Sequence, residues 1–417
     1  MKAQFITFKH EGGKPGNVVY VEDGQVHFQA CRFTGGKANE DESIVGWGLA
    51  LGNSTTGQVT ECKIDGNEYG MTTSGESNVV IENNDMSNNK KFGLWFSDKT
   101  TSTTRKNVFM KNGWNGIGAG GDSKPTIENN LVTNNNGGIW LTNNTAAVVR
   151  NNQFINNINN GIDVRYNARP ELRENSILNN RKYGIYISEE AAPLIVGNTI
   201  SNNKFGVRVL KNAKPEIEGN EITKNKTHGI VFLDDSAGTV RKNKVLENKG
   251  VGILLGGKSH PDLEENIVSK SFHGIQYSED STGTATKNQI TENKIAGVYL
   301  NGKSHPDLEE NIISKNIIGI NYRDDSTGTA TKNQITENKG GISVSMQAYP
   351  TLIENIITNN LGEGIGYYDK GAGKAIRNEC SGNQYGIAIW EQDTNPTLED
   401  NILKENKKGD LLDKRKK

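Results

Sequence analysis

The sequence predicts an all-β solenoid: a single-stranded parallel β-helix of about 16–17 coils, each 22–23 residues long. Two observations carry this prediction. First, residues 256–293 and 301–338 are nearly identical at an offset of 45 residues, and each 45-residue unit contains two related halves. Second, one Asn recurs once in every half, from Asn84 to Asn401, in steps that are always 22 or 23 residues. One half of the repeat therefore corresponds to one coil.

Each coil is expected to hold three short strands joined by turns. Apolar residues alternate with polar ones in short bursts such as 184–188 and 194–200, and a period of two is typical of strands. No stretch of ten residues shows a helical period, and Asn or Gly interrupts the pattern every few residues. Strands stacked in register bring the recurring Asn side chains above one another, where they can form a ladder of hydrogen bonds.

The regular repeats extend over residues 62–406. Residues 1–61 are expected to form less regular coils of the same β-helix, and residues 407–417 a basic C-terminal tail. Neither end carries an amphipathic helix that would cover the terminal coil, so end-to-end contacts or a fused neighbouring domain are expected. The first residues lead into strand-like sequence without a signal peptide, which leaves the compartment open.

The composition excludes several classes of protein. Lys and Arg (48) balance Asp and Glu (49), so we expect no bulk binding of nucleic acid. No run of 18 apolar residues is present, so no membrane-spanning segment is expected. Three cysteines are too few for a disulfide scaffold or a zinc site. Cys31 and Cys62 occupy the ladder position and Cys380 an aliphatic one, so all three are expected to be buried thiols.

The repeat units resemble those of a known group. Residues 341–360 (GISVSMQAYPTLIENIITNN) and 386–406 (GIAIWEQDTNPTLEDNILKEN) are similar to the carbohydrate-binding and sugar-hydrolase (CASH) or NosD-type repeats of the pectin-lyase-like superfamily. The resemblance covers about residues 20–406 and implies a right-handed coil and an interaction with polysaccharide. The matching residues are those that build the coil, so the resemblance does not choose a particular function.

Function must then lie on side chains that point outward. In the strand after each Gly-Ile or Gly-Val pair, alternate residues face solvent, and one outward column contains Trp95, Trp140 and Tyr186 two coils apart. Their rings are expected about 9.6 Å apart, because coils are spaced by about 4.8 Å. Flat aromatic rings can stack on pyranose sugars. These three residues, with Tyr299 and Arg323 farther along the chain, are therefore predicted to bind a polysaccharide.

Charged side chains lie on the coils next to Tyr186. Asp163, Arg165 and Arg208 are the predicted catalytic residues if the chain is an enzyme: Arg can bind the carboxylate of a uronate, and Asp can act as acid or base. The enzyme would then be a lyase, epimerase or hydrolase acting on uronate-containing glycans. The same residues also fit a surface ion cluster that only neutralises charge.

The even length of the coils favours a binding module over an enzyme. Loops never lengthen between residues 62 and 401, whereas catalytic sites are usually built from loops that wall a groove. We therefore expect a non-catalytic module that binds polysaccharide on its lateral sheet face. A polysaccharide-active enzyme is the first alternative, and a protein-binding or structural spacer is the second.

Acidic residues follow the outward column at the same turn in alternate coils, for example Asp234 and Asp235. Calcium is the ion that such carboxylates would bind. Successive acidic turns lie about two coils apart, however, while calcium ligands lie within about 2.5 Å of one ion. The sequence therefore predicts no metal or other cofactor, with calcium at a turn such as Asp234–Asp235 as a weak alternative.

Overall fold

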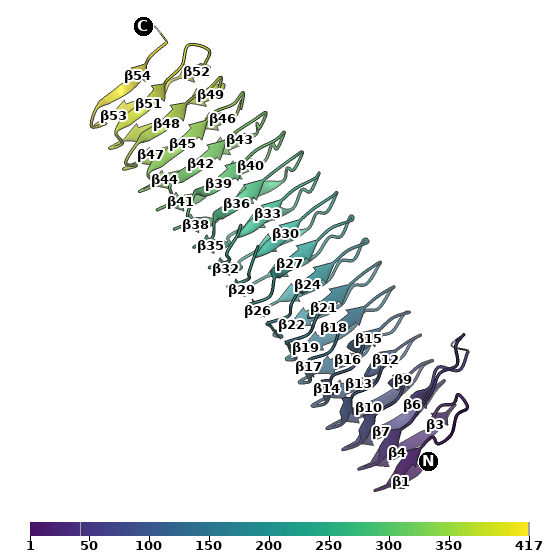
Figure 1. Ribbon diagram of the computed structural model, residues 1–417. Helices are drawn as coiled ribbons and strands as arrows, with labels where there is room; N and C mark the ends of the chain where they lie inside the picture. Colours follow the sequence, from purple (N-terminus) through teal and green to yellow (C-terminus); the bar gives the residue numbers. More distant parts are fainter. Residues whose placement is uncertain (42, 416–417) are drawn as a thin grey trace. The chain divides into compact units, whose positions relative to one another are not determined.

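The computed structural model describes residues 1–41 and 43–415, and this part of the chain consists of strands and turns without a helix. The chain divides into two compact units, Met1–Val207 and Arg208–Lys417. Within each unit the strands run parallel and lie side by side in three sheets (Figure 1). A helix of the length and apolarity needed to cross a membrane is absent from the described residues. The predicted all-β parallel β-helix is confirmed.

In the first unit each sheet takes one strand from every coil. The first sheet contains β1 (Lys2–Gln4), β4 (Gln25–Gln29), β7 (Thr56–Thr60), β10 (Asn78–Glu82), β13 (Thr103–Arg105), β16 (Thr126–Glu128), β19 (Val148–Arg150), β22 (Glu171–Arg173) and β25 (Leu194–Val196). The second contains β2 (Thr7–Lys9), β5 (Arg32–Thr34), β8 (Lys63–Asp65), β11 (Asp85–Ser87), β14 (Val108–Met110), β17 (Leu131–Thr133), β20 (Gln153–Ile155), β23 (Ser176–Leu178) and β26 (Thr199–Ser201). The third contains β3 (Val19–Val21), β6 (Trp47–Leu51), β9 (Tyr69–Thr73), β12 (Leu94–Phe96), β15 (Asn115–Ala119), β18 (Gly137–Leu141), β21 (Ile162–Val164) and β24 (Tyr183–Ile187), and β27 (Phe205–Val209) spans the unit boundary.

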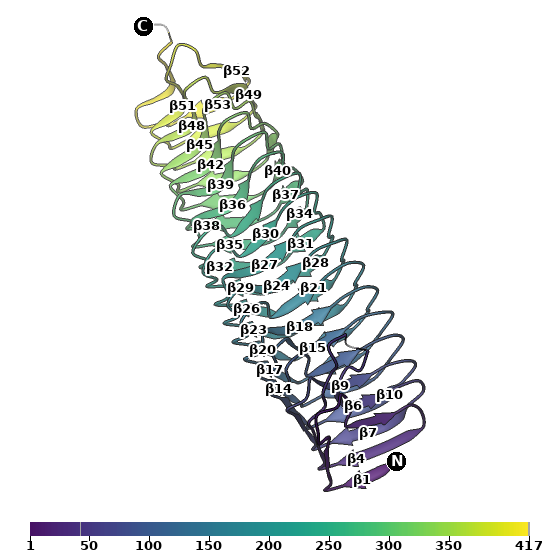
Figure 2. The same ribbon diagram turned by 45° about the vertical axis from the view of Figure 1, so that its right-hand side comes forward.

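The second unit repeats this order. Its first sheet contains β28 (Glu216–Glu218), β31 (Thr239–Arg241), β34 (Asp262–Glu264), β37 (Thr284–Thr286), β40 (Asp307–Glu309), β43 (Thr329–Thr331), β46 (Thr351–Ile353), β49 (Ala372–Ile376) and β52 (Asn395–Glu399). The second contains β29 (Glu221–Thr223), β32 (Lys244–Leu246), β35 (Ile267–Ser269), β38 (Gln289–Thr291), β41 (Ile312–Ser314), β44 (Gln334–Thr336), β47 (Ile356–Thr358), β50 (Glu379–Ser381) and β53 (Ile402–Lys404). The third contains β30 (Ile230–Phe232), β33 (Ile253–Leu255), β36 (His273–Tyr277), β39 (Ala296–Leu300), β42 (Ile318–Tyr322), β45 (Gly340–Val344), β48 (Glu363–Tyr367), β51 (Tyr385–Ile389) and β54 (Gly409–Asp413). Figure 2 shows β29, β32, β35 and β38 in one column.

The described residues form 18 coils, because 54 strands are shared among coils of three strands each. The sequence predicts 16 or 17 coils, and the difference arises at the N-terminal end. Strands β1 to β3 form a first coil that lacks the ladder Asn, with Ile6 directly before β2 where later coils carry Asn. At the other end β54 lies within the predicted basic tail and pairs with β51, and it completes the coil of Asn401. Only the first coil therefore escapes a count that rests on Asn spacing.

The predicted Asn ladder is present, and it joins side-chain amides to one another and to the backbone. Asn107 Oδ1 accepts hydrogen bonds from the backbone N–H of Asn84 at 2.8 Å and from Asn84 Nδ2 at 2.9 Å. Asn84 Nδ2 also donates to the carbonyl of Val59 at 2.9 Å. A second ladder follows five residues later, as Asn89 and Asn112 show, and Ser271 takes the place of Asn in one coil of it. Each Asn thereby satisfies buried backbone groups at a turn, which are costly to leave without a partner.

Aliphatic side chains from all three sheets fill the interior of each coil. Ile127 of β16, Val132 of β17 and Ile139 of β18 are completely buried, one from each sheet of one coil. Cys31, Cys62 and Cys380 are free and buried, as predicted from their positions in the repeat. Because the interior is closed, only the outward-facing side chains differ enough between coils to form a site.

Candidate functional site: an aromatic groove

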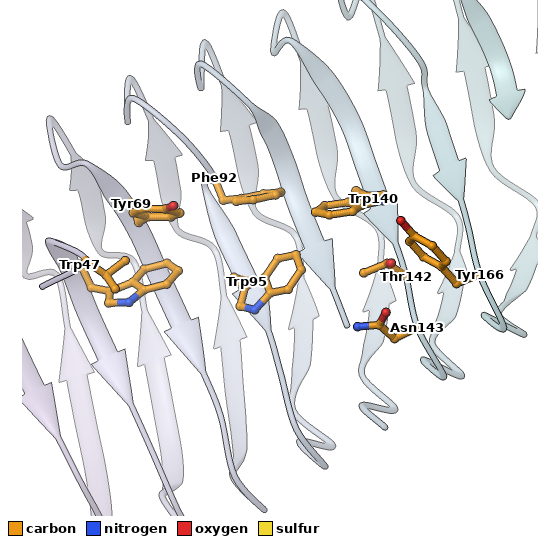
Figure 3. Close-up of a pocket in the computed structure, with 9 residues that line it drawn as sticks. Trp47, Tyr69, Phe92, Trp95, Trp140, Thr142, Asn143 and Tyr166 are labelled. Carbon is orange, nitrogen blue, oxygen red and sulfur yellow. The ribbon is translucent and has the colours of Figure 1, made fainter. Parts of the chain in front are cut away.

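The outer face of the third sheet in the first unit carries a groove of about 490 Å³. Aromatic rings from several coils line it, together with a few neutral side chains (Figure 3): Val45, Trp47, Tyr69, Phe92, Trp95, Trp140, Thr142, Asn143 and Tyr166. None of the lining residues is a carboxylate or a cation. The groove is therefore apolar and aromatic, with hydroxyl and amide groups at its edge.

The rings come from two outward positions on each strand. Trp95 and Trp140 occupy the position two residues after the recurring Gly, whereas Tyr69 and Phe92 directly precede that Gly. The sequence analysis identified the first column only. An aromatic residue directly precedes Gly48, Gly70 and Gly93. This recurrence is a sequence signal for Tyr69 and Phe92, which the sequence analysis did not identify.

A glycine in β15 determines how closely the rings approach. Gly118 pairs with Trp95 on one side and with Trp140 on the other. A Cβ atom at Gly118 would lie 2.3 Å from Cε3 of Trp95 and 2.9 Å from Cε1 of Phe92, so the rings lean into space that only glycine leaves open. The centroids of Trp95 and Trp140 are consequently 5.8 Å apart. The expected spacing of 9.6 Å is wrong, because it assumes side chains perpendicular to the sheet.

Three rings of the groove are nearly parallel. The rings of Tyr69 and Phe92 are 6.4 Å apart at an interplanar angle of 20°, and those of Phe92 and Trp140 are 6.1 Å apart at 9°. Figure 3 shows these three rings in a row, with Trp47 and Trp95 alongside. Trp95 and Trp140 are half-buried, and Tyr166 at the end of the groove is 48% exposed. Tyr69 and Phe92 are buried, at 8% and 4% exposed, so solvent reaches this aromatic strip at the tryptophans and at Tyr166.

Two of the predicted catalytic residues lie beyond the groove, Asp163 on β21 and Arg165 directly after it. Arg165 donates two hydrogen bonds to the Asp163 carboxylate, Nε to Oδ1 at 2.8 Å and Nη2 to Oδ2 at 3.0 Å. Asn160 Nδ2 donates to the same Oδ2 at 2.9 Å, and Asp163 is only 8% exposed. These hydrogen bonds raise the pKa of Arg165 above its ordinary value. The guanidinium also lies 5.0 Å from the centroid of Tyr186, so Asp163, Arg165 and Tyr186 form one cluster.

The other predicted site residues belong to the second unit. Arg208 lies near His228, whose pKa is lowered by burial and further by the positive charge of Arg208. The ring of Tyr299 stacks on His273 with a centroid distance of 4.6 Å. Arg323 lines a separate groove of about 480 Å³ and places Nη2 3.1 Å from the sulfur of Met346.

The acidic turns have a structural role in the backbone. Asp234 Oδ2 accepts a hydrogen bond from the backbone N–H of Lys211 at 3.2 Å, and Asp98 Oδ2 accepts one from Gly75 at 3.0 Å. Both donors have positive φ and belong to the preceding coil. No group of three or more His, Cys, Asp or Glu in residues 1–41 and 43–415 is placed to hold a metal ion. Calcium at Asp234 and Asp235 stays an untested expectation.

The comparison with known proteins agrees with this architecture. Residues 10–154, 137–295 and 251–403 match the family described as right handed beta helix region, and the chain belongs to this family. No curated protein matches the chain.

Solved structures that resemble the chain do so at low identity. The periplasmic alginate epimerase AlgG shares 14% identity over 79% of this chain and 77% of its own, with a TM-score of 0.44. The A-module of the mannuronan C-5 epimerase AlgE4 of Azotobacter vinelandii shares 15% identity over 79% and 91%, with a TM-score of 0.46. A tailspike protein of the E. coli bacteriophage HK620, in complex with a pentasaccharide, shares 11% identity over 91% and 72%, with a TM-score of 0.36. These values assign no function to this chain.

Proposed function

We propose that the protein binds polysaccharide and that the aromatic groove of the first unit is its binding surface. One observation carries the proposal: aromatic rings from successive coils line one groove on the outer face of the third sheet, where Trp95, Trp140 and Tyr166 keep part of their surface exposed. Rigid aromatic side chains supply contact area at low entropic cost and combine an apolar face with a polar edge. A strip that crosses several coils suits an extended ligand made of flat units, such as a chain of pyranose rings.

The chemistry of the lining favours binding without catalysis. Glycosidic and uronate chemistry requires carboxylates or basic groups at the reacting bond, and the groove lining contains neither. Both oxygens of Asp163 are already engaged by Arg165 and Asn160. A polysaccharide-active enzyme remains the competing proposal, and it would require these hydrogen bonds to open when substrate binds.

The test is a glycan-binding titration with matched variants. Trp95→Ala and Trp140→Ala should each weaken binding at least about tenfold, equivalent to about 1.4 kcal/mol, because each removes a central ring. Tyr349→Ala is the control, since Tyr349 is an exposed aromatic residue (49%) outside the groove. Thermal unfolding of each variant separates lost binding from lost folding. Equal affinity in all four proteins would contradict the proposal.

The same samples distinguish a module from an enzyme. Bound glycans should be recovered unchanged, with no new reducing ends and no unsaturated uronate absorbance. Appearance of either product, together with its loss in Asp163→Asn, would replace the binding module with a polysaccharide-active enzyme.

A further inference from the structure

The outer face of the second sheet in the second unit is regular and uncharged over five consecutive strands, β35 to β47. Each strand points two side chains outward, a first residue that is Ile or Gln and a second that is Ser or Thr. The isoleucines Ile267, Ile312 and Ile356 are 37%, 44% and 46% exposed. A flat sheet face with a row of exposed isoleucines is unusual on a solvated surface.

Charged residues run along both edges of this face and alternate in sign from coil to coil. The edge before the strands carries one charged residue per coil: Lys242, Glu265, Lys287, Glu310, Lys332, Glu354 and Arg377. The edge after the strands carries the opposite sign in the same coil: Glu247, Lys270, Glu292, Lys315 and Glu337. In every one of five successive coils, the two edges therefore bear opposite charges.

Glu354 and Arg377 form a close ion pair at 2.8 Å, whereas the charges of the five coils with two charged edges are only weakly paired within the chain. Lys287 Nζ lies 3.8 Å from Glu310, and Lys315 Nζ lies 3.9 Å from Glu337. The four side chains are 43–59% exposed, and exposed pairs at such distances contribute little to stability. The edges thus retain most of their capacity to pair with charges on another molecule.

We propose that this face binds the same face of a second copy of the chain, about a two-fold axis parallel to the direction in which the coils stack. Such an axis places each coil opposite the same coil of the partner copy and exchanges the two edges. Glu310 of one copy then faces Lys315 of the other, and Lys287 faces Glu292. Because the edges carry opposite signs in each coil, every facing pair is complementary.

The uncharged residues between the edges fit the same operation. The axis places the first outward residue of a strand opposite the second outward residue of the partner strand. Ile312 therefore meets Ser314, and Ile267 meets Ser269, so that a large side chain faces a small one. The two-fold axis thus matches both the charge pattern and the side-chain volumes of this face.

The size of the face sets the strength of the association. Seven coils, from β32 to β50, at about 4.8 Å each and a width of about 16 Å give on the order of 500 Å² per copy, below the about 800 Å² per partner of a typical stable interface. The dimer is accordingly weak and salt-sensitive, with a dissociation constant in the micromolar range or above. A weak dimer of this kind doubles the number of aromatic grooves per particle.

Sedimentation of the full chain over a range of concentrations tests the proposal with two complementary variants. Glu310→Lys leaves two positive edges in its coil and Lys315→Glu leaves two negative edges, so each variant alone should dimerise at least about tenfold more weakly than wild type. When the two variants are mixed, each positive edge faces a negative one. The mixture should therefore associate with an affinity within about threefold of wild type.

Further variants make the result specific to this face. Ile312→Glu, which places a charge on an already exposed position, should abolish association. Lys303→Glu, the same charge change at an exposed turn outside this sheet, should leave it unchanged. A wild-type chain that stays monomeric at every accessible concentration would overturn the proposal. Failure of the mixed variants to associate, when circular dichroism shows them folded, would overturn the two-fold arrangement.

Discussion

The third sheet carries a groove in each unit, and the two grooves differ in chemistry although the strands beneath them are alike. In the first unit, β12, β15 and β18 present rings around Gly118, and the lining is neutral. In the second, β42, β45 and β48 present Arg323, Lys339, Glu363 and Tyr368 around the small side chain of Ser343. Both units share the Asn ladders and a closed apolar interior. A single scaffold thus carries different surfaces, because only the outward columns are free to vary.

The largest expected effect comes from removing one ladder Asn in each unit. It tests whether the ladders stabilise the two units equally. Asn130→Ala in the first unit and Asn311→Ala in the second each remove an Oδ1 that accepts two hydrogen bonds and an Nδ2 that donates to a buried carbonyl. Each buried group left without a partner costs about 1–3 kcal/mol, so both variants should lose about 4 kcal/mol. Denaturant unfolding measures this loss. A large difference between the two variants would show that the ladders do not contribute equally.

Lowering the pH should reduce the stability of the second unit, through a buried histidine. Burial lowers the pKa of His273 to about 4, from an ordinary value of 6.5. The unfolded chain therefore binds the proton more readily than the folded one between these values. Stability is complete above about pH 6.5 and falls as the pH drops toward 4, by up to about 3 kcal/mol.

His273→Phe provides the control for this prediction. The variant retains a ring that can stack on Tyr299 but cannot be protonated. Its unfolding free energy, measured from pH 7 to pH 4, should show a shallower pH dependence than wild type. Identical slopes would mean that His273 is not the titrating group.

The variant with the smallest expected change in stability alters only the first groove. Gly118→Val introduces side-chain atoms where Trp95 and Phe92 now lie, and such overpacking costs about 1–3 kcal/mol. The displaced rings should also lower glycan affinity and change the tryptophan fluorescence. Ser343→Val, at the matching position of the second unit, should leave glycan binding to the first groove intact. A Gly118→Val protein with full affinity would show that the close approach of the rings is not required.

The repeat could be predicted in detail because it depends on local sequence. Regular Asn spacing predicted the ladder, and position in the repeat predicted that Cys62 and Cys380 are buried. Burial raises the pKa of each of these two thiols to about 12. The number of coils was underestimated because the first coil has Ile6 at the ladder position, whereas β54 of the predicted tail completes the coil of Asn401. These departures lie where the repeat signal itself ends.

The candidate site was predicted only in part. Trp95 and Trp140 were identified from their outward column, and Asp163, Arg165 and Tyr186 do form one cluster. Tyr69 and Phe92 were missed because a residue beside the turn glycine was not expected to reach the same face as the outward column. The neutral character of the groove was likewise missed, since Asp163 and Arg165 neutralise each other outside it.

The sequence by itself determined the all-β class, the coil length, the ladder and the buried positions of this protein, because each follows from a period of two within strands and of 22–23 between coils. Only the tertiary structure decided how outward side chains lean. Trp95 and Trp140 approach to 5.8 Å because Gly118 between them leaves room that neighbouring side chains can enter. Backbone periodicity sets where a side chain begins, but packing against the next coils sets where its ring comes to lie.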